Sequence, residues 1–210
     1  MEAQHRADPG TNTMSTNVTT IPAAVADRLI RGRVAADILL VLGASALIAI
    51  AAQVTIPLPF NPIPLTLQPL AVIFLGAALG ARRGAAASAL YLVAGFSGLP
   101  VFAGGHSGPS MLTAVTAGYL FSYPLASWVA GKFSELGWGH RVVRSTIGML
   151  AALGVIYLGG WSWLSTFSNA SVAFSIGVAP FVIADIVKVA IGAALLPYAE
   201  KLIASTTLER

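Results

Sequence analysis

The sequence contains no cysteine and few charged residues. Only 10% of its 210 residues are Asp, Glu, Lys or Arg, whereas 56% are hydrophobic; a typical soluble domain has about a quarter charged residues. So few charged side chains cannot cover the surface of a soluble domain of this length. The absence of cysteine excludes disulfides and thiolate nucleophiles, and three scattered histidines form no metal-binding cluster. The composition predicts an integral membrane protein without a cofactor or metal site.

Six apolar stretches are candidate membrane spans, and most of them reach the roughly 20 residues that a spanning helix needs. They are residues 34–52, 66–81, 84–103, 111–131, 142–164 and 176–200. Proline and glycine interrupt the second and third, so we expect short helices there, which membranes tolerate where the backbone lines a cavity. The sequence predicts an all-α bundle of six transmembrane helices in residues 25–205, preceded by a flexible cytoplasmic tail, residues 1–24, that is too polar to fold alone.

The first stretch, preceded by several arginines, also resembles a signal peptide, with Ala49-Ile50-Ala51 as a cleavage site. That site lies far beyond the usual signal-peptide length, and the apolar pattern continues after it. A retained first helix is therefore the simpler interpretation.

The twelve basic residues are unevenly distributed along the chain. They form no stripe or aromatic-interleaved patch, so we expect no nucleic-acid partner. Ten lie before the first stretch, after the last, or in alternate connections, and Arg144 lies at the beginning of the stretch that follows one of these connections. The remaining connections, residues 53–65, 104–110 and 165–175, contain neither Lys nor Arg. Because basic residues accumulate on the cytoplasmic side, we expect both termini in the cytoplasm and a multi-pass protein of the bacterial inner membrane.

The twelfth basic residue, Lys188, lies inside the last stretch, three positions after Asp185. This spacing places both side chains on one helical face. Ionisable groups within a bilayer are costly, so they usually face a partner or a cavity. Two interpretations stay open: a structural ion pair, or a polar ligand site. Counted from Pro180 as the start of the helix, Asp185 is expected about 8 Å and Lys188 about 12 Å below the external end, in a pocket that opens outward.

Two connections on the expected external side are unusual. Residues 53–69 contain five prolines, which favour extended backbone, and predict either a stiff flap over a small ligand or a plain linker. Its candidate ligand contacts are Phe60, Asn61, Thr66 and Gln68. Residues 98–109 are rich in glycine, which permits close backbone approach to a ligand, although an ordinary membrane turn would use glycine too.

Several motifs occur in order along most of residues 34–200: Pro64-Leu-Thr-Leu-Gln68, Gly80-Ala-Arg-Arg-Gly84, Leu90-Tyr-Leu92, Gly98-Leu-Pro-Val-Phe-Ala-Gly-Gly105, Gly118-Tyr-Leu120, and Pro180-Phe181 with Asp185 and Lys188. Together they resemble the BioY family, the biotin-binding S components of energy-coupling-factor transporters. The resemblance implies a non-enzymatic membrane protein that captures biotin from outside. It also implies partners, a transmembrane coupling subunit and two ABC-type ATPases, although some members are thought to act without dedicated partners.

The resemblance implies roles for particular residues. Asp185 would accept hydrogen bonds from the ureido N–H groups of biotin, and Lys188 would either donate to the ureido carbonyl or neutralise the carboxylate. Tyr91 resembles the binding tyrosine of the family, although a lone aromatic residue in a membrane span is often only packing. The remaining predicted contacts are Gln68, Thr66, Phe60, Phe102, Gly104, Gly105 and His106.

Two other functions compete with ligand binding. The tetrapeptides Gly95-Phe-Ser-Gly98 and Gly105-His-Ser-Gly108 resemble the G-x-S-G serine of rhomboid-type intramembrane proteases, but that chemistry needs a well-placed histidine base, and His106 adjoins its serine. A stand-alone proton-coupled carrier would use Asp185 as a relay, without a second acidic site to support it. No phosphate-binding loop of the type G-x-x-x-x-G-K-[ST] occurs, so ATP hydrolysis is assigned to partner subunits.

Overall fold

The computed structural model describes residues 23–208 except residues 60 and 140. The predicted tail therefore lies almost wholly outside the described residues. The chain divides into two units, residues 1–35 and 36–210. In the first unit, residues 23–35 are helical and form the beginning of helix α1. The following description concerns the second unit.

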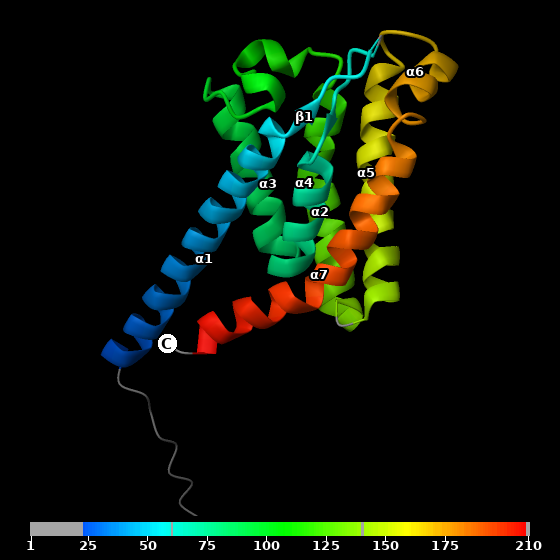
Figure 1. Ribbon diagram of the computed structural model, residues 1–210. Coiled ribbons are helices and arrows are strands. Elements are labelled where there is room, and N and C mark those ends of the chain that lie inside the picture. Colours follow the sequence, from blue (N-terminus) through cyan, green and yellow to red (C-terminus); the bar gives the residue numbers. More distant parts are fainter. Residues whose placement is uncertain (1–22, 60, 140, 209–210) are drawn as a thin grey trace, which may run out of the picture. The chain divides into compact units, whose positions relative to one another are not determined.

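The architecture is helical, as the sequence predicts (Figure 1). The α-helices are α1 (Ala23–Gln53), α2 (Gln68–Leu79), α3 (Ala81–Phe96), α4 (Ala117–Phe133), α5 (Val142–Leu164), α6 (Ala170–Gly177) and α7 (Val182–Leu208). The shorter elements are the 3₁₀ turns η1 (Ala103–Gly105) and η2 (Pro109–Leu112), the π-helical turn η3 (Ser134–Trp138), and the strands β1 (Thr55–Ile56) and β2 (Leu65–Thr66). Three segments are long and apolar enough to cross a membrane: Val34–Gln53, Val142–Leu164 and Val182–Ala199.

The middle helices are shorter than the apolar stretches that predict them. Helix α2 has 12 residues and α3 has 16. Helix α3 ends at Phe96 because the backbone turns at Gly98, whose φ of 106° is accessible to glycine. Helix α4 begins at Ala117 rather than at residue 111, since the preceding residues form η2. The expectation of short helices in the second and third stretches is confirmed.

Most of helix α6 lies in residues 165–175, which were expected to be a connection, and only its end falls in the last apolar stretch. Helix α6 ends at Gly177, and a turn closed by a 3.0 Å hydrogen bond from the Phe181 N–H to the Val178 carbonyl separates it from α7. Pro180 lies in this turn, so the predicted helix start at Pro180 is wrong. Asp185 falls in the first turn of α7, about 4.5 Å from its start rather than 8 Å. Its carboxylate thus lies near the positive end of the helix dipole.

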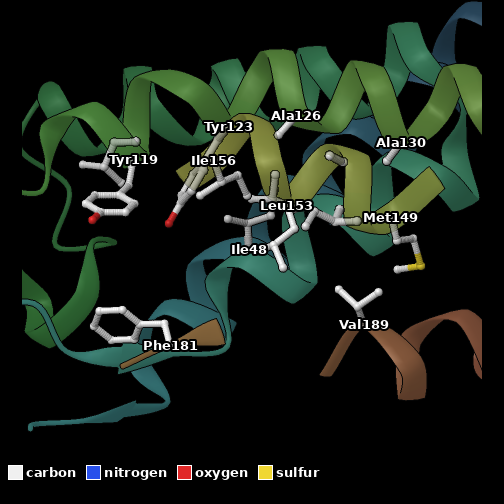
Figure 2. Packing of buried hydrophobic residues seen from close by; sticks show 14 of the residues in the cluster. Ile48, Tyr119, Tyr123, Ala126, Ala130, Met149, Leu153, Ile156, Phe181 and Val189 are labelled. Carbon is white, nitrogen blue, oxygen red and sulfur yellow. The ribbon is translucent and has the colours of Figure 1, made fainter. Parts of the chain in front are cut away.

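The core is built from small residues at helix contacts and larger apolar residues between them (Figure 2). Gly76 of α2 packs directly against Ser127 of α4, and Gly84 of α3 packs against Gly76. Gly131 of α4 lies against the backbone of Ala81. Large apolar side chains such as Ile183 and Val143 point outward and are 79% and 74% exposed, as expected of lipid-facing positions.

The connections gather at two ends of the helical unit (Figure 1). The strands, η1, η2 and α6 lie at one end, which we call the pocket end. The α2–α3 connection and the α4–α5 connection lie at the other, which we call the opposite end. The external connections predicted from the sequence thus share one end.

Candidate ligand-binding site

A cavity of about 580 Å³ lies at the pocket end. Its volume is in the range of small-molecule sites. The lining is mostly apolar and comes from the β1–β2 hairpin, the start of α2, the loop before α4, and helices α4, α5 and α7. The polar residues in the lining include Thr55, Asn61, Thr66, Gln68, His106, Thr116, Tyr119, Tyr123, Tyr157 and Asp185. An apolar cavity with a few convergent polar groups is suited to one small ligand that is itself partly polar.

Among the described lining residues, Asp185 is the acidic one, and the residue is only 4% exposed to solvent. The Lys188 ammonium donates to Oδ1 at 2.8 Å, and the Tyr157 hydroxyl donates to Oδ2 at 2.8 Å. Each carboxylate oxygen can accept one more hydrogen bond. The arrangement holds Asp185 in a fixed orientation with acceptor capacity left for a ligand donor.

Lys188 lies behind this carboxylate and is absent from the cavity lining. Its ammonium also donates to the backbone carbonyl of Thr66 at 2.7 Å, so it connects α7 to the end of β2. Its side chain is 14% exposed and that of Asp185 is 6% exposed. A buried ion pair with satisfied hydrogen bonds is far less costly than either charge alone.

A second hydrogen-bonded chain begins at Gln68, the first residue of α2. The Gln68 side-chain amide donates to the Tyr91 hydroxyl at 2.6 Å, and that hydroxyl donates to the Val101 carbonyl at 3.2 Å. The Tyr91 ring meets Phe102 edge to face, with centroids 5.5 Å apart. Tyr91 therefore supports Gln68 and Phe102 from behind.

The loop around η1 is held tightly. The Phe102 N–H donates to the His106 carbonyl at 3.1 Å, and the Gly105 N–H donates to the Phe102 carbonyl at 3.0 Å. Gly104 and Gly105 have φ of 69° and 74°, which favour glycine. The side-chain amide of Gln53 donates to the Phe102 carbonyl at 3.2 Å. These bonds fix His106 at the cavity.

The proline-rich connection is a short antiparallel hairpin, in which Thr55 pairs with Thr66 and Ile56 with Leu65. Its tip is tied to α6, because the Asn61 amide donates to the Ile176 carbonyl at 2.8 Å. Asn61 also accepts a hydrogen bond from the Ile63 N–H at 2.9 Å. The hairpin covers one side of the cavity, as the flap interpretation predicts.

The structure places the eleven predicted site residues in four groups. Seven line the cavity: Asn61, Thr66, Gln68, Phe102, Gly104, His106 and Asp185. Tyr91 and Lys188 lie one hydrogen bond behind it. Gly105 belongs to the η1 turn without lining the cavity, and Phe60 lies outside the described residues. From the sequence we expect the pocket between the external connections and the third to sixth apolar stretches. The third stretch, residues 84–103, lines the cavity through Phe102 and Ala103, which follow α3, whereas no described residue of α3 itself does so. The start of α2 also lines the cavity.

Several cavity residues are missing from the sequence-based prediction. Tyr119 and Tyr123 are four residues apart on α4, and their hydroxyl groups lie on the same side of that helix (Figure 2). The Tyr119 hydroxyl donates to the Gly177 carbonyl at 2.7 Å. Two tyrosines four residues apart share one helix face, so their spacing within an apolar span could have indicated a polar strip facing a cavity. Nothing in the sequence pairs Tyr157 with Asp185, since the two residues are 28 positions apart.

The G-x-S-G serines gain no catalytic partner in the described part of the chain. Ser97 follows the last residue of α3, and Ser107 follows η1. No hydrogen bond there joins either serine to a histidine, and His5 and His140 are not among the described residues.

An apolar helical bundle with one partly polar cavity near its end defines the class of small-molecule-binding membrane proteins. Comparison with known proteins agrees. Residues 14–205 match the profile of the BioY family. The chain belongs to the BioY family.

Individual relatives support this assignment. The chain is 40% identical over 146 residues to a probable biotin transporter BioY of Pyrococcus horikoshii, covering 69% of this chain and 84% of the relative. It is 34% identical over 162 residues to the biotin transporter BioY of Thermotoga maritima, covering 75% and 92%. The crystal structure of the S-component for biotin from an ECF-type ABC transporter shares the fold, with a TM-score of 0.71, 20% identity, and coverage of 81% of this chain and 93% of the other.

Proposed function

We propose that this protein is a biotin-binding S component that captures biotin for import without altering it chemically. Membership of the BioY family and the names of the relatives support the ligand. The single observation that carries the proposal is Asp185, a buried carboxylate that lines an apolar cavity and is held by Lys188 and Tyr157.

The chemistry of biotin suits this arrangement. Its ureido group offers two N–H donors and one carbonyl, its ring is apolar, and its side chain ends in a carboxylate. The free lone pairs of Asp185 would accept the ureido N–H groups. The Tyr119, Tyr123 and Phe181 rings would pack against the bicyclic ring.

The same contacts narrow the role of Lys188. Its ammonium is already bonded to Asp185 and to the Thr66 carbonyl, and it is not in the cavity lining. The carboxylate of a ligand placed there would be repelled by the carboxylate of Asp185. We therefore assign Lys188 to neutralising and orienting Asp185, with the ureido group of biotin toward Asp185 and its carboxylate directed away.

The test is saturable binding of radiolabelled biotin to the purified protein in lipid nanodiscs. Unlabelled biotin should displace the label, and a chemically unrelated vitamin such as riboflavin should not. Binding that fails to saturate, or that both vitamins displace equally, would overturn the proposal. Absence of any binding by protein that unfolds cooperatively on heating would do the same.

We further propose six spanning helices, α1, α2, α3, α4, α5 and α7, in residues 25–205, with both termini and a flexible tail of residues 1–24 in the bacterial cytoplasm. The distribution of basic residues supports this topology. Because the chain has no cysteine, single cysteines can report it. In intact cells a membrane-impermeant thiol reagent should label Ser110→Cys and Ser171→Cys but not Leu136→Cys, and the reverse pattern would overturn this orientation.

The energy source is proposed to be a transmembrane coupling subunit with two ABC-type ATPases. Proteoliposomes containing the S component with these subunits should accumulate biotin when ATP is present. Proteoliposomes with the S component alone should bind biotin without accumulating it. Uptake against a gradient by the single chain would instead favour a stand-alone carrier.

A further inference from the structure

The pocket end carries almost no charge. The sequence has no Asp, Glu, Lys or Arg in residues 38–81, 84–131 or 145–184. These ranges include the β1–β2 hairpin, the loop between α3 and α4, and α6, which together form the pocket end. Within them His106 is the single side chain that can become cationic near neutral pH.

A carboxylate ligand placed in this cavity needs a partner at a distance from Asp185. Beside Asp185 it would meet a second negative charge, and the Lys188 ammonium there is already shared between Asp185 and Thr66. The other titratable groups of the lining are the phenols of Tyr119, Tyr123 and Tyr157, which carry no positive charge. Among the lining residues that the structure describes, His106 is thus the one that can offer a cation to the ligand.

His106 is well positioned for this role. It lines the cavity, and its residue is solvent-exposed, so its imidazole can exchange protons with water. Its backbone is fixed by the bond from the Phe102 N–H, and the Phe102 carbonyl is held in turn by Gln53. A fixed backbone reduces the entropy lost when the side chain pairs with a ligand.

We propose that protonated His106 pairs with the carboxylate of the bound ligand and makes ligand binding tighter in mildly acidic medium. This inference rests on the proposed function, because it takes biotin as the ligand. Imidazole side chains gain and lose a proton between about pH 5 and 8. An aliphatic carboxyl group ionises near about pH 4.3, so the ligand stays negative throughout that range.

The experiment measures biotin affinity by calorimetry in nanodiscs at about pH 5.5 and about pH 8. An ion pair in contact with water changes the binding affinity only modestly. The wild-type protein should therefore bind biotin about two- to fivefold more tightly at the lower pH. His106→Gln should lose this difference, and His106→Lys should bind tightly at both pH values. Biotinamide, which lacks the carboxylate, should bind with the same affinity at both pH values. As a matched control, His140→Gln should retain the wild-type pH dependence.

Each result decides the inference. If His106→Gln keeps the pH dependence, or if biotinamide shows it too, another group is responsible and the inference is wrong. If the wild-type protein binds biotin equally well at both pH values, the inference fails while the proposed function stands. If it binds biotin at neither pH, both fail. Melting temperatures of the variants at each pH separate a loss of affinity from a loss of folding.

Discussion

The two ends of the helical unit are held together in different ways. At the pocket end, polar side chains reach backbone carbonyls far away in the sequence: Asn61 to Ile176, Tyr119 to Gly177, and Lys188 to Thr66. The net contribution of one such hydrogen bond to the free energy of folding is only about 0.5–1.5 kcal/mol. The pocket end is thus closed by a few separate bonds that can break one at a time.

The opposite end is held by close packing and by charges. Gly131 meets the backbone at Ala81 with no space for a side chain, and the nearby Glu135 carboxylate accepts a 2.9 Å bond from the Ala81 N–H. Arg83 of α3 pairs with Asp37 of α1 at 2.6 Å. Tightly packed interiors deform little. The ion pairs of Arg83 and Glu135 belong to the opposite end, whereas the covering segments of the pocket end are tied to the helices by single hydrogen bonds, so we expect those segments to yield first.

The largest expected effect comes from removing the charge at the cavity. Asp185→Asn should weaken biotin binding by about 2–5 kcal/mol, because the Lys188 ammonium is left buried without its counter-ion and the ligand loses a charged acceptor. Calorimetry or equilibrium dialysis in nanodiscs measures the change. Lys188→Ala should cost a similar amount, and wild-type affinity in either variant would contradict the proposed site.

The next effect should appear at the opposite end and leave the cavity unchanged. Gly131→Ala adds a methyl group against the backbone at Ala81 and should destabilise the fold by about 1–3 kcal/mol. Thermal unfolding in nanodiscs checks this, and the biotin affinity of the folded protein should not change. The matched control is Gly154→Ala in α5, which has open space around it and should leave stability equal or up to about 1 kcal/mol higher.

A smaller effect is expected where the hairpin is tied to α6. Asn61→Ala removes the bond to the Ile176 carbonyl and should speed biotin dissociation by about two- to tenfold, with little change in melting temperature. A chase experiment with unlabelled biotin measures the rate. Thr113→Ala serves as the control, because its hydroxyl bonds only to the Ser110 carbonyl in its own turn. Equal dissociation rates for Asn61→Ala and wild type would show that this bond does not hold the hairpin closed.

The smallest effect is expected at Glu135. The Lys132 ammonium, at 2.8 Å, and then the Ala81 N–H hold the pKa of Glu135 below its usual value. A carboxylate with a lowered pKa in the folded state stabilises the protein at neutral pH, and this contribution is lost as the pH falls through the folded-state value. Because both side chains of this pair are exposed and solvent screens it, Glu135→Gln should cost only about 0.2–1 kcal/mol at neutral pH and low salt. The difference in melting temperature from wild type should disappear in acid; a difference that persists there would exclude this electrostatic origin.

Much of the fold could be predicted from composition and periodicity. Long apolar runs mark helices because each helix satisfies its own backbone hydrogen bonds in lipid, so α5 has its predicted bounds and α1 ends within one residue of its predicted end. Helix α1 begins at Ala23, well before the apolar run that starts at residue 34. Helix α6 was missed, because most of it lies in residues 165–175, which were expected to be a connection. The Asn169 side chain caps this short helix by accepting a hydrogen bond from the Val172 N–H, a local feature that a count of apolar residues does not show.

The sequence predicts the candidate site only where a residue type is energetically unfavourable or unusual in its surroundings. A lone charge pair in an apolar stretch identifies Asp185 and Lys188, and proline and glycine identify the covering segments. Tyr157 is an ordinary residue of an apolar helix until folding brings it to Asp185. The sequence likewise could not show that Lys188 bonds to Asp185 and to the Thr66 carbonyl without itself lining the cavity, since helical spacing places two residues on one face but gives no contacts to other elements.

The side-chain nitrogen of Lys188 connects the proposed ligand-binding carboxylate to the hairpin that covers the cavity. The Lys188 nitrogen bonds both to the acid of the site and to the end of β2, so a displacement of one partner strains its bond to the other. We therefore expect ligand occupancy of the proposed site and the position of the hairpin to be linked through Lys188. A spin label on the hairpin would sense an event at the floor of the cavity without touching the ligand.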